Sequence, residues 1–114
     1  MDADMSPEMA HQVLEMLTGG GSMDNINTSL ALRLIPLAQD LGKEDLIERL
    51  LEHATKVARN EEERGWAKFE ALKVMEAGLD SFVRLAEEAE HLEQAQALTA
   101  AVHHYVALLL SLIH

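Results

Sequence analysis

The chain has 114 residues, a formal net charge of −11, 48% hydrophobic residues and no cysteine. Its length fits one domain, and its negative charge repels nucleic-acid phosphates and anionic lipids, so we expect neither a nucleic acid nor a membrane as a partner. The absence of cysteine excludes disulfide and thiolate chemistry, which fits the cytoplasmic location that we predict.

The residue types predict an all-α fold. Only 4% of the residues are aromatic, whereas β-sheets depend on aromatic and β-branched side chains. The chain has six glycines and two prolines, and three of the glycines are adjacent at 19–21, so the remainder holds few turn signals. We therefore expect a four-helix bundle or a helical-hairpin array, with an extra short N-terminal helix.

Residues 1–18 predict that short helix. Ser6 is a suitable N-cap, Pro7 fits the first helical position, and Glu8 suits the positive end of the helix dipole. One apolar stripe follows, formed by Met9, Val13, Leu14 and Leu17 with Met16 at its edge. Because an isolated helix of about a dozen residues is marginal in water, this one needs a surface to lie on.

Residues 19–22 read Gly-Gly-Gly-Ser and are followed directly by Met23. Runs of Gly and Ser form flexible linkers. We interpret residues 1–18 as a partner peptide fused through this linker to a helical bundle domain at 23–114. The alternative is a natural glycine-rich loop followed by an ordinary methionine. A short linker raises the effective concentration of a tethered peptide to roughly millimolar, which would hold a weak ligand in place.

Four helices are expected between residues 24 and 113. The first contains Pro36, which predicts a kink or a late start, and ends at Gly42. A clean apolar stripe at 46–58 marks the second helix. Asn60, with Glu63 three residues later, resembles a capping box, and predicts that the third helix starts there and reaches about residue 90. The fourth helix runs from about residue 92 to the end of the chain.

Apolar stripes predict which side chains of these helices face inward. Their members are Ile26, Leu30, Leu34, Ile35, Ala38 and Leu41 in the first helix; Leu46, Ile47, Leu50, Leu51, Ala54, Val57 and Ala58 in the second; Trp66, Phe69, Leu72, Leu79, Phe82, Val83, Ala86 and Ala89 in the third; and Ala95, Leu98, Val102, Tyr105, Val106 and Leu109 in the fourth. The sequence also resembles itself, since 37–54 aligns with 85–102, which is typical of repeated helical hairpins.

The motifs of catalysis and metal binding give little support for an enzyme. The chain lacks a Gly-x-Ser-x-Gly motif, a P-loop and a dinucleotide-binding fingerprint. Glu8-x-x-His11 and Glu88-x-x-His91 match the motif of di-iron bundles, but they flank the apolar stripes rather than lie within them. We therefore predict no catalytic residues, no metal ligands and no cofactor.

The end of the chain carries more apolar surface than a small domain can enclose. Residues 105–113 are apolar on nearly every side of a helix, and such a helix is either central to a bundle or part of an interface. We expect this end to face a partner helix or a second subunit. The alternative is that it forms the centre of the bundle.

These observations lead to a non-enzymatic adaptor or chaperone-like module that binds a short amphipathic helix of a protein partner in an apolar groove. The peptide anchors would be Met9, Val13, Leu14 and Leu17, and the groove would be lined by Leu30, Leu34, Val106, Leu109 and Leu110. One alternative is a structural homo-oligomer held together by residues 108–113. A second alternative is a di-metal carboxylate bundle.

Overall fold

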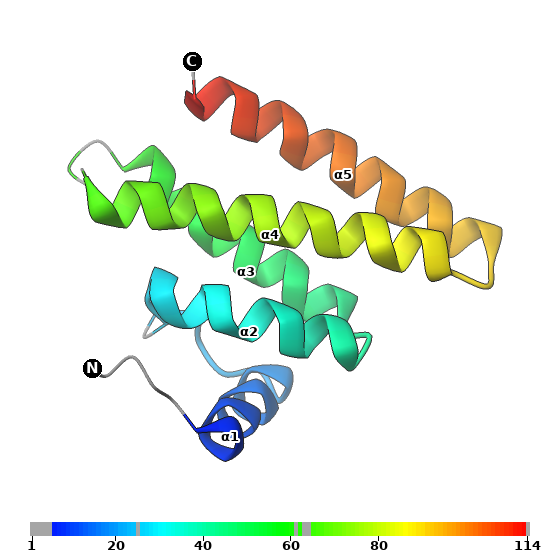
Figure 1. Cartoon of the computed structure of the whole chain (residues 1–114), viewed down its shortest axis with the longest axis horizontal. Coiled ribbons are helices and arrows are strands. Elements are labelled where there is room, and N and C mark those ends of the chain that lie inside the picture. The colour runs from blue at the N-terminus through cyan, green and yellow to red at the C-terminus, as the bar shows by residue number, and fades with distance from the viewer. Residues whose placement is uncertain (1–5, 25, 61, 63–64, 114) are drawn as a thin grey trace.

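The chain folds into α-helices. The computed structural model describes residues 6–24, 26–60, 62 and 65–113. Within these ranges it contains α1 (Pro7–Thr18), α2 (Thr28–Asp40), α3 (Glu44–Arg59), α4 (Trp66–Glu88) and α5 (Leu92–Ile113), and no strand (Figure 1). The predicted all-α bundle with a short N-terminal helix is confirmed.

Helix α4 is the central element. It packs against α2, α3 and α5, while α3 also contacts α2 and α5. Helix α1 packs against α2. It lies at one side of the molecule, and α5 lies at the opposite side (Figure 1). Helices α1 and α5 therefore lie on different surfaces of the bundle.

The internal similarity of the sequence corresponds to two helical hairpins. Residues 37–54 contain the end of α2, the turn, and most of α3, whereas residues 85–102 contain the end of α4, the turn, and the first half of α5. The first turn uses Gly42 at a φ of 68°, a left-handed conformation that glycine adopts without steric cost. Pro36 lies inside α2 and is exposed. Helix α2 starts before the proline and continues past it, so the predicted late start is wrong.

The predicted start of the third bundle helix at Asn60 is wrong. Asn60 ends α3, because its backbone N–H donates to the carbonyl oxygens of Lys56 and Val57. Its side-chain oxygen then accepts from the N–H of Glu62 in the following turn, at 3.0 Å. Helix α4 begins only at Trp66, after Gly65 at a φ of 65°. The other half of the expected capping box, Glu63, lies outside the described residues.

Most of the predicted apolar stripes form the core, and α3 follows its prediction closely. The buried α3 members are Leu46, Ile47, Leu50, Leu51, Ala54 and Ala58, and Val57 is half-buried. The start of α4 differs, since Trp66 is 68% and Phe69 47% exposed. These rings pack on each other, with centroids 5.3 Å apart, rather than in the core. Further along, the predicted Leu79 and Phe82 are buried. They are joined on the inner face of α4 by residues outside the predicted stripe: Ala71, Val74, Met75, Gly78 and Ser81.

Close packing and polar contacts attach α4 to its neighbours. A Cβ atom at Gly78 would lie 2.7 Å from Leu51 Cδ2, so glycine allows α3 and α4 to approach closely. The Glu70 carboxylate accepts hydrogen bonds from the hydroxyls of Thr28 (3.1 Å) and Ser29 (3.0 and 2.7 Å) at the start of α2. A carboxylate at this position also suits the positive end of the α2 dipole.

Candidate functional site: the docked N-terminal helix and the outer side of α5

Helix α1 lies on the surface of the bundle with one apolar face buried. Ser6 caps it, since its hydroxyl accepts from the N–H of Met9 at 3.2 Å. Leu14 and Leu17 are 1% and 0% exposed, and Ala10 is buried beside them. Because α1 packs on α2, these side chains occupy the kind of position expected for anchors of a docked amphipathic helix.

The four predicted peptide anchors differ in burial. Leu14 and Leu17 are buried and Val13 is half-buried, whereas Met9 is 53% exposed. Met16, at the edge of the predicted stripe, is 52% exposed. The contact face of α1 is therefore centred on its two leucines and on Ala10, which the sequence analysis did not include.

The structure does not bring the five predicted groove residues together. Leu30 and Leu34 are on α2, which contacts α1, and Leu34 is fully buried. The remaining three, Val106, Leu109 and Leu110, belong to α5 on the opposite side of the molecule (Figure 1). Since α4 separates the two sides, α1 does not lie in a groove between the first and last helices of the bundle; it lies on α2.

The glycine-rich connection after α1 forms a hydrogen-bonded turn. The backbone N–H groups of Gly19, Gly20 and Gly21 donate to the carbonyl oxygens of Glu15, Leu17 and Met16, respectively. A Cβ atom on Gly21 would lie 2.9 Å from the Met16 oxygen, and Gly20 has a φ of 100°, so both positions favour glycine. In the described chain this segment therefore has a defined conformation.

Arg49 of α3 joins the bundle to the end of α1. Its Nη1 donates to the Leu17 carbonyl oxygen and its Nη2 to the Gly21 carbonyl oxygen, both at 2.6 Å. The last turn of α1 has no basic residue of its own. A positive charge is favourable at the negative end of a helix dipole, and the last carbonyls of a helix lack internal partners. Arg49 satisfies both requirements from another helix.

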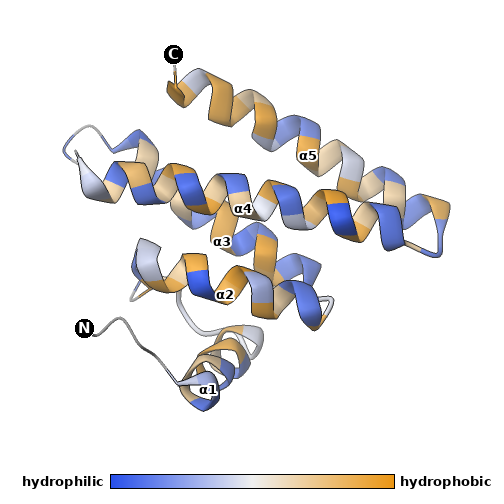
Figure 2. Ribbon diagram, viewed as in Figure 1, coloured by the Kyte–Doolittle hydropathy of each residue, from blue (hydrophilic) through white to orange (hydrophobic). Residues whose placement is uncertain are grey.

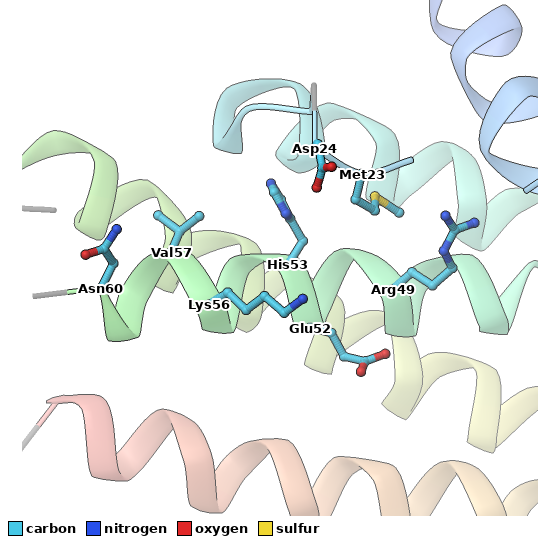
Figure 3. A pocket seen from close by; sticks show the side chains of 8 residues that line it. All are labelled: Met23, Asp24, Arg49, Glu52, His53, Lys56, Val57 and Asn60. Atoms are coloured by element: carbon cyan, nitrogen blue, oxygen red, sulfur yellow. The ribbon is translucent and has the colours of Figure 1, made fainter. Parts of the chain in front are cut away.

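A second contact fixes the segment that leads into α2. The Nε2 atom of His53 lies 2.6 Å from the Ile26 carbonyl oxygen, and because a carbonyl only accepts, His53 is the donor. Figure 3 shows His53 pointing from α3 toward the segment that carries Met23 and Asp24, whereas Glu52 points the other way. These side chains border a pocket of about 400 Å³ along α3, whose lining is Met23, Asp24, Arg49, Glu52, His53, Lys56, Val57 and Asn60.

The pocket is lined by both charged and apolar side chains. Its lining combines basic and acidic side chains and, as described, holds no serine, threonine or cysteine that would serve as a nucleophile. Sequence reasoning missed Arg49 and His53. The available signal was their spacing, because residues 49, 53 and 56 share one face of α3.

The residues of the two Glu-x-x-His motifs do not converge. Glu8 and His11 are exposed on α1, Glu88 ends α4, and His91 lies in the turn before α5. Throughout the described ranges, no group of three or more His, Cys, Asp or Glu side chains is arranged to hold a metal ion.

Helix α5 lies at the periphery of the bundle. It contacts α4 and, less extensively, α3, and its buried residues in the described structure are Leu98 and Tyr105. Burial, reinforced by the nearby carboxylates of Glu48 and Glu52, raises the pKa of Tyr105 to about 12. In the described structure α5 does not form the centre of the bundle, so that alternative is wrong. The expectation that this helix end faces a partner helix or a second subunit stays a prediction.

Large apolar side chains are exposed along α5. Leu92 is 72%, Val106 37%, Leu110 50% and Ile113 59% exposed, and Figure 2 shows that the C-terminal half of the helix is mainly hydrophobic. By length and composition alone, α5 is the one helix of the described chain that meets the requirements for crossing a membrane.

Comparisons with protein families, with curated proteins and with solved structures found no match to this chain.

Proposed function

We propose that this chain is a non-enzymatic helical adaptor that binds a short amphipathic helix along α2, and that α1 occupies this binding site. The observation that carries the proposal is that α1 buries Leu14 and Leu17 while a side chain of a different helix, Arg49, holds its C-terminal end. The recognised ligand would be a helix with two buried leucines and a free last turn.

The apolar part of this contact supplies binding energy. Fully burying a leucine is worth about 1.5–3 kcal/mol, so two leucines contribute roughly 3–6 kcal/mol before ordering costs. If these leucines and the Arg49 hydrogen bonds together leave a net of about 4–5.5 kcal/mol after ordering costs, the dissociation constant is on the order of 0.1–1 mM, that of a weak ligand. A tether that provides roughly millimolar effective concentration keeps a ligand of this affinity bound for much of the time.

The Arg49 contact supplies direction. The guanidinium donates to the Leu17 carbonyl oxygen in the last turn of α1 and to the Gly21 carbonyl oxygen in the turn after it. The carbonyls of a helix point toward its C-terminal end, so a helix docked in the reverse direction would lose the hydrogen bond in its last turn. Hydrogen bonds that involve a charged group contribute about 1.5–3 kcal/mol each where they are protected from water. The site therefore selects both an apolar stripe and an orientation.

The test is an exchange experiment that starts from the intact chain. A protease site is inserted between Ser22 and Met23, the folded protein is cleaved, and a fluorescent peptide covering residues 6–21 is added. We expect saturable binding with a dissociation constant on the order of 0.1–1 mM by fluorescence anisotropy. A peptide with Leu17→Asp should not bind, whereas the matched control Met16→Asp, changed at an exposed position, should bind like the original.

Two results would contradict the proposal. One is that the peptide fails to bind although circular dichroism shows that the cleaved protein keeps its helices. The other is equal binding of the Leu17→Asp and Met16→Asp peptides, since that would show that the buried face of α1 does not determine recognition.

A further inference from the structure

The outer side of α5 combines exposure with an absence of charge. From Gln94 to Ile113 the sequence contains no Asp, Glu, Lys or Arg. The surface residues of a helix at the edge of a bundle are ordinarily charged or polar. In contrast, the 16 residues of α3 contain seven buried ones and a charged outer face. An uncharged outer face on a chain of net charge −11 therefore needs an explanation.

Seven of the exposed residues of α5 lie on one line with the spacing of a coiled coil. One line of positions advances by alternating steps of four and three, and every member of it is exposed: Leu92, Gln96, Thr99, His103, Val106, Leu110 and Ile113. We call this set the outer seam. Steps of four and three average 3.5 residues, the repeat that keeps a stripe facing a partner helix along its whole length. The residues that pack on α3 and α4, including Leu98 and Tyr105, lie on another side of α5.

We propose that the outer seam of α5 binds the outer seam of a second copy of this chain. Helix α5 lies across the molecule from α1, so an interface on α5 is separate from the proposed peptide site (Figure 1). Two copies related by a twofold axis present the same patch to each other, so the patch must complement itself. An uncharged seam is compatible with this condition, because no member of it is an Asp, Glu, Lys or Arg that would meet its own copy.

The distribution of side chains along the seam supports a helix as occupant. Its C-terminal part, with Val106, Leu110 and Ile113, is apolar, whereas the three members before it, Gln96, Thr99 and His103, are polar. Polar residues at seam positions of coiled coils fix the register at some cost in stability, so we expect the apolar C-terminal part to supply most of the binding energy. At 1.5 Å per residue, a helix of 22 residues provides a contact about 33 Å long.

A lipid bilayer fits the same surface less well. Helices that lie on membranes carry Lys and Arg beside the apolar face, and the sequence has no basic residue after Arg84 apart from its histidines. A membrane-spanning α5 would also have to leave α3 and α4, with which Tyr105 is packed. The net charge of −11 further opposes association with anionic lipid.

Sedimentation equilibrium of the full chain tests the proposal. We expect the wild-type protein to sediment at twice its 12.6 kDa chain mass. Leu110→Glu and Val106→Glu should each weaken association at least tenfold, because symmetry places two new carboxylates in one apolar contact. Ser111→Glu adds the same charge one residue from Leu110, at a position about 100° around the helix and outside the seam, and should dimerise like the wild type.

Helical content, measured by circular dichroism, must be unchanged in the variants that are compared. Both seam residues are partly exposed in the single chain, so their substitution leaves the bundle core intact. A wild-type chain that remains monomeric up to high micromolar concentration would overturn the proposal, as would equal loss of association in Ser111→Glu. Flotation of a monomeric wild-type chain with phosphatidylcholine vesicles would overturn it and would assign the outer seam to a bilayer.

Discussion

Replacement of Leu17 by alanine should detach α1 and leave the other four helices folded. Leu17 is fully buried, and truncation of such a leucine costs about 2–5 kcal/mol. The two buried leucines of α1 together contribute roughly 3–6 kcal/mol. The loss is therefore comparable to the whole contribution of the docked face, so α1 should leave the surface rather than remain with a cavity beneath it.

Hydrogen exchange followed by mass spectrometry measures this outcome helix by helix. In Leu17→Ala, the amides of α1 should lose their protection, whereas those of α3 and α4 should keep most of theirs. Leu50→Ala is the matched comparison, since it makes the same change at an equally buried position in the centre of α3. That substitution should reduce protection in α3 and α4 and should lower the free energy of global unfolding by about 2–5 kcal/mol.

Met16→Ala is the control within α1. Met16 is 52% exposed, and substitutions at such surface positions ordinarily change stability by no more than about 0.5 kcal/mol, so α1 should keep its protection. If Leu17→Ala and Leu50→Ala reduce the protection of α3 and α4 equally, then α1 is an integral part of one cooperative bundle. The interpretation of α1 as a separable ligand would then be wrong.

Three further outcomes are expected. Arg49→Met should weaken binding of the residue 6–21 peptide by about 10–100-fold in anisotropy titrations, at about 1.4 kcal/mol per factor of ten. The control Arg59→Met, at an exposed position of the same helix, should leave the affinity unchanged. Equal affinities of the two variants would show that Arg49 takes no part in recognition. The single tyrosine, Tyr105, should ionise near pH 12 in an absorbance titration. Because its pKa is higher in the folded than in the unfolded chain, the contribution of un-ionised Tyr105 to the free energy of unfolding should be complete below pH 10 and lost as the pH rises through 12. Ionisation near pH 10 in the folded chain would contradict its burial. Glu70→Ala should lower the free energy of unfolding by about 1–3 kcal/mol in denaturant titrations, because it leaves the buried hydroxyl of Thr28 in α2 without its acceptor. Glu76→Ala, at an exposed position, should lower it by less than about 0.5 kcal/mol. Equal losses would exclude the hydrogen bond as the cause.

The fold class followed from the sequence because the periodicity of the helices is strong. The stripe from Leu46 to Ala58 predicted the buried face of α3, and the Gly42 signal located the turn before it. The start of α4 was harder to locate, because Asn60 is equally suitable at either end of a helix. The backbone N–H of Asn60 donates to carbonyl oxygens at the end of α3. Local sequence does not reveal whether such a residue caps the preceding or the following helix.

The candidate site was predicted only in part. The apolar stripe of α1 predicted the burial of Leu14 and Leu17, since that signal is contained within one helix. The surface on which α1 lies depends on the order in which the helices pack, and helix periodicity carries no information on that order. Arg49 was missed for a related reason: its spacing with His53 shows that the two share a face of α3, but not that the end of α1 lies next to that face.

The packing order of the helices also determines how fast the chain can fold. Apart from the contacts of α4 with α2 and of α3 with α5, each described helix packs on its neighbour along the chain. Short sequence separations between contacting segments require little loop-closure entropy, so helical proteins of this kind fold within microseconds to milliseconds. The hairpin of α2 and α3 and that of α4 and α5 can each form locally, and α1 can add to α2 as a last step without rearranging either hairpin.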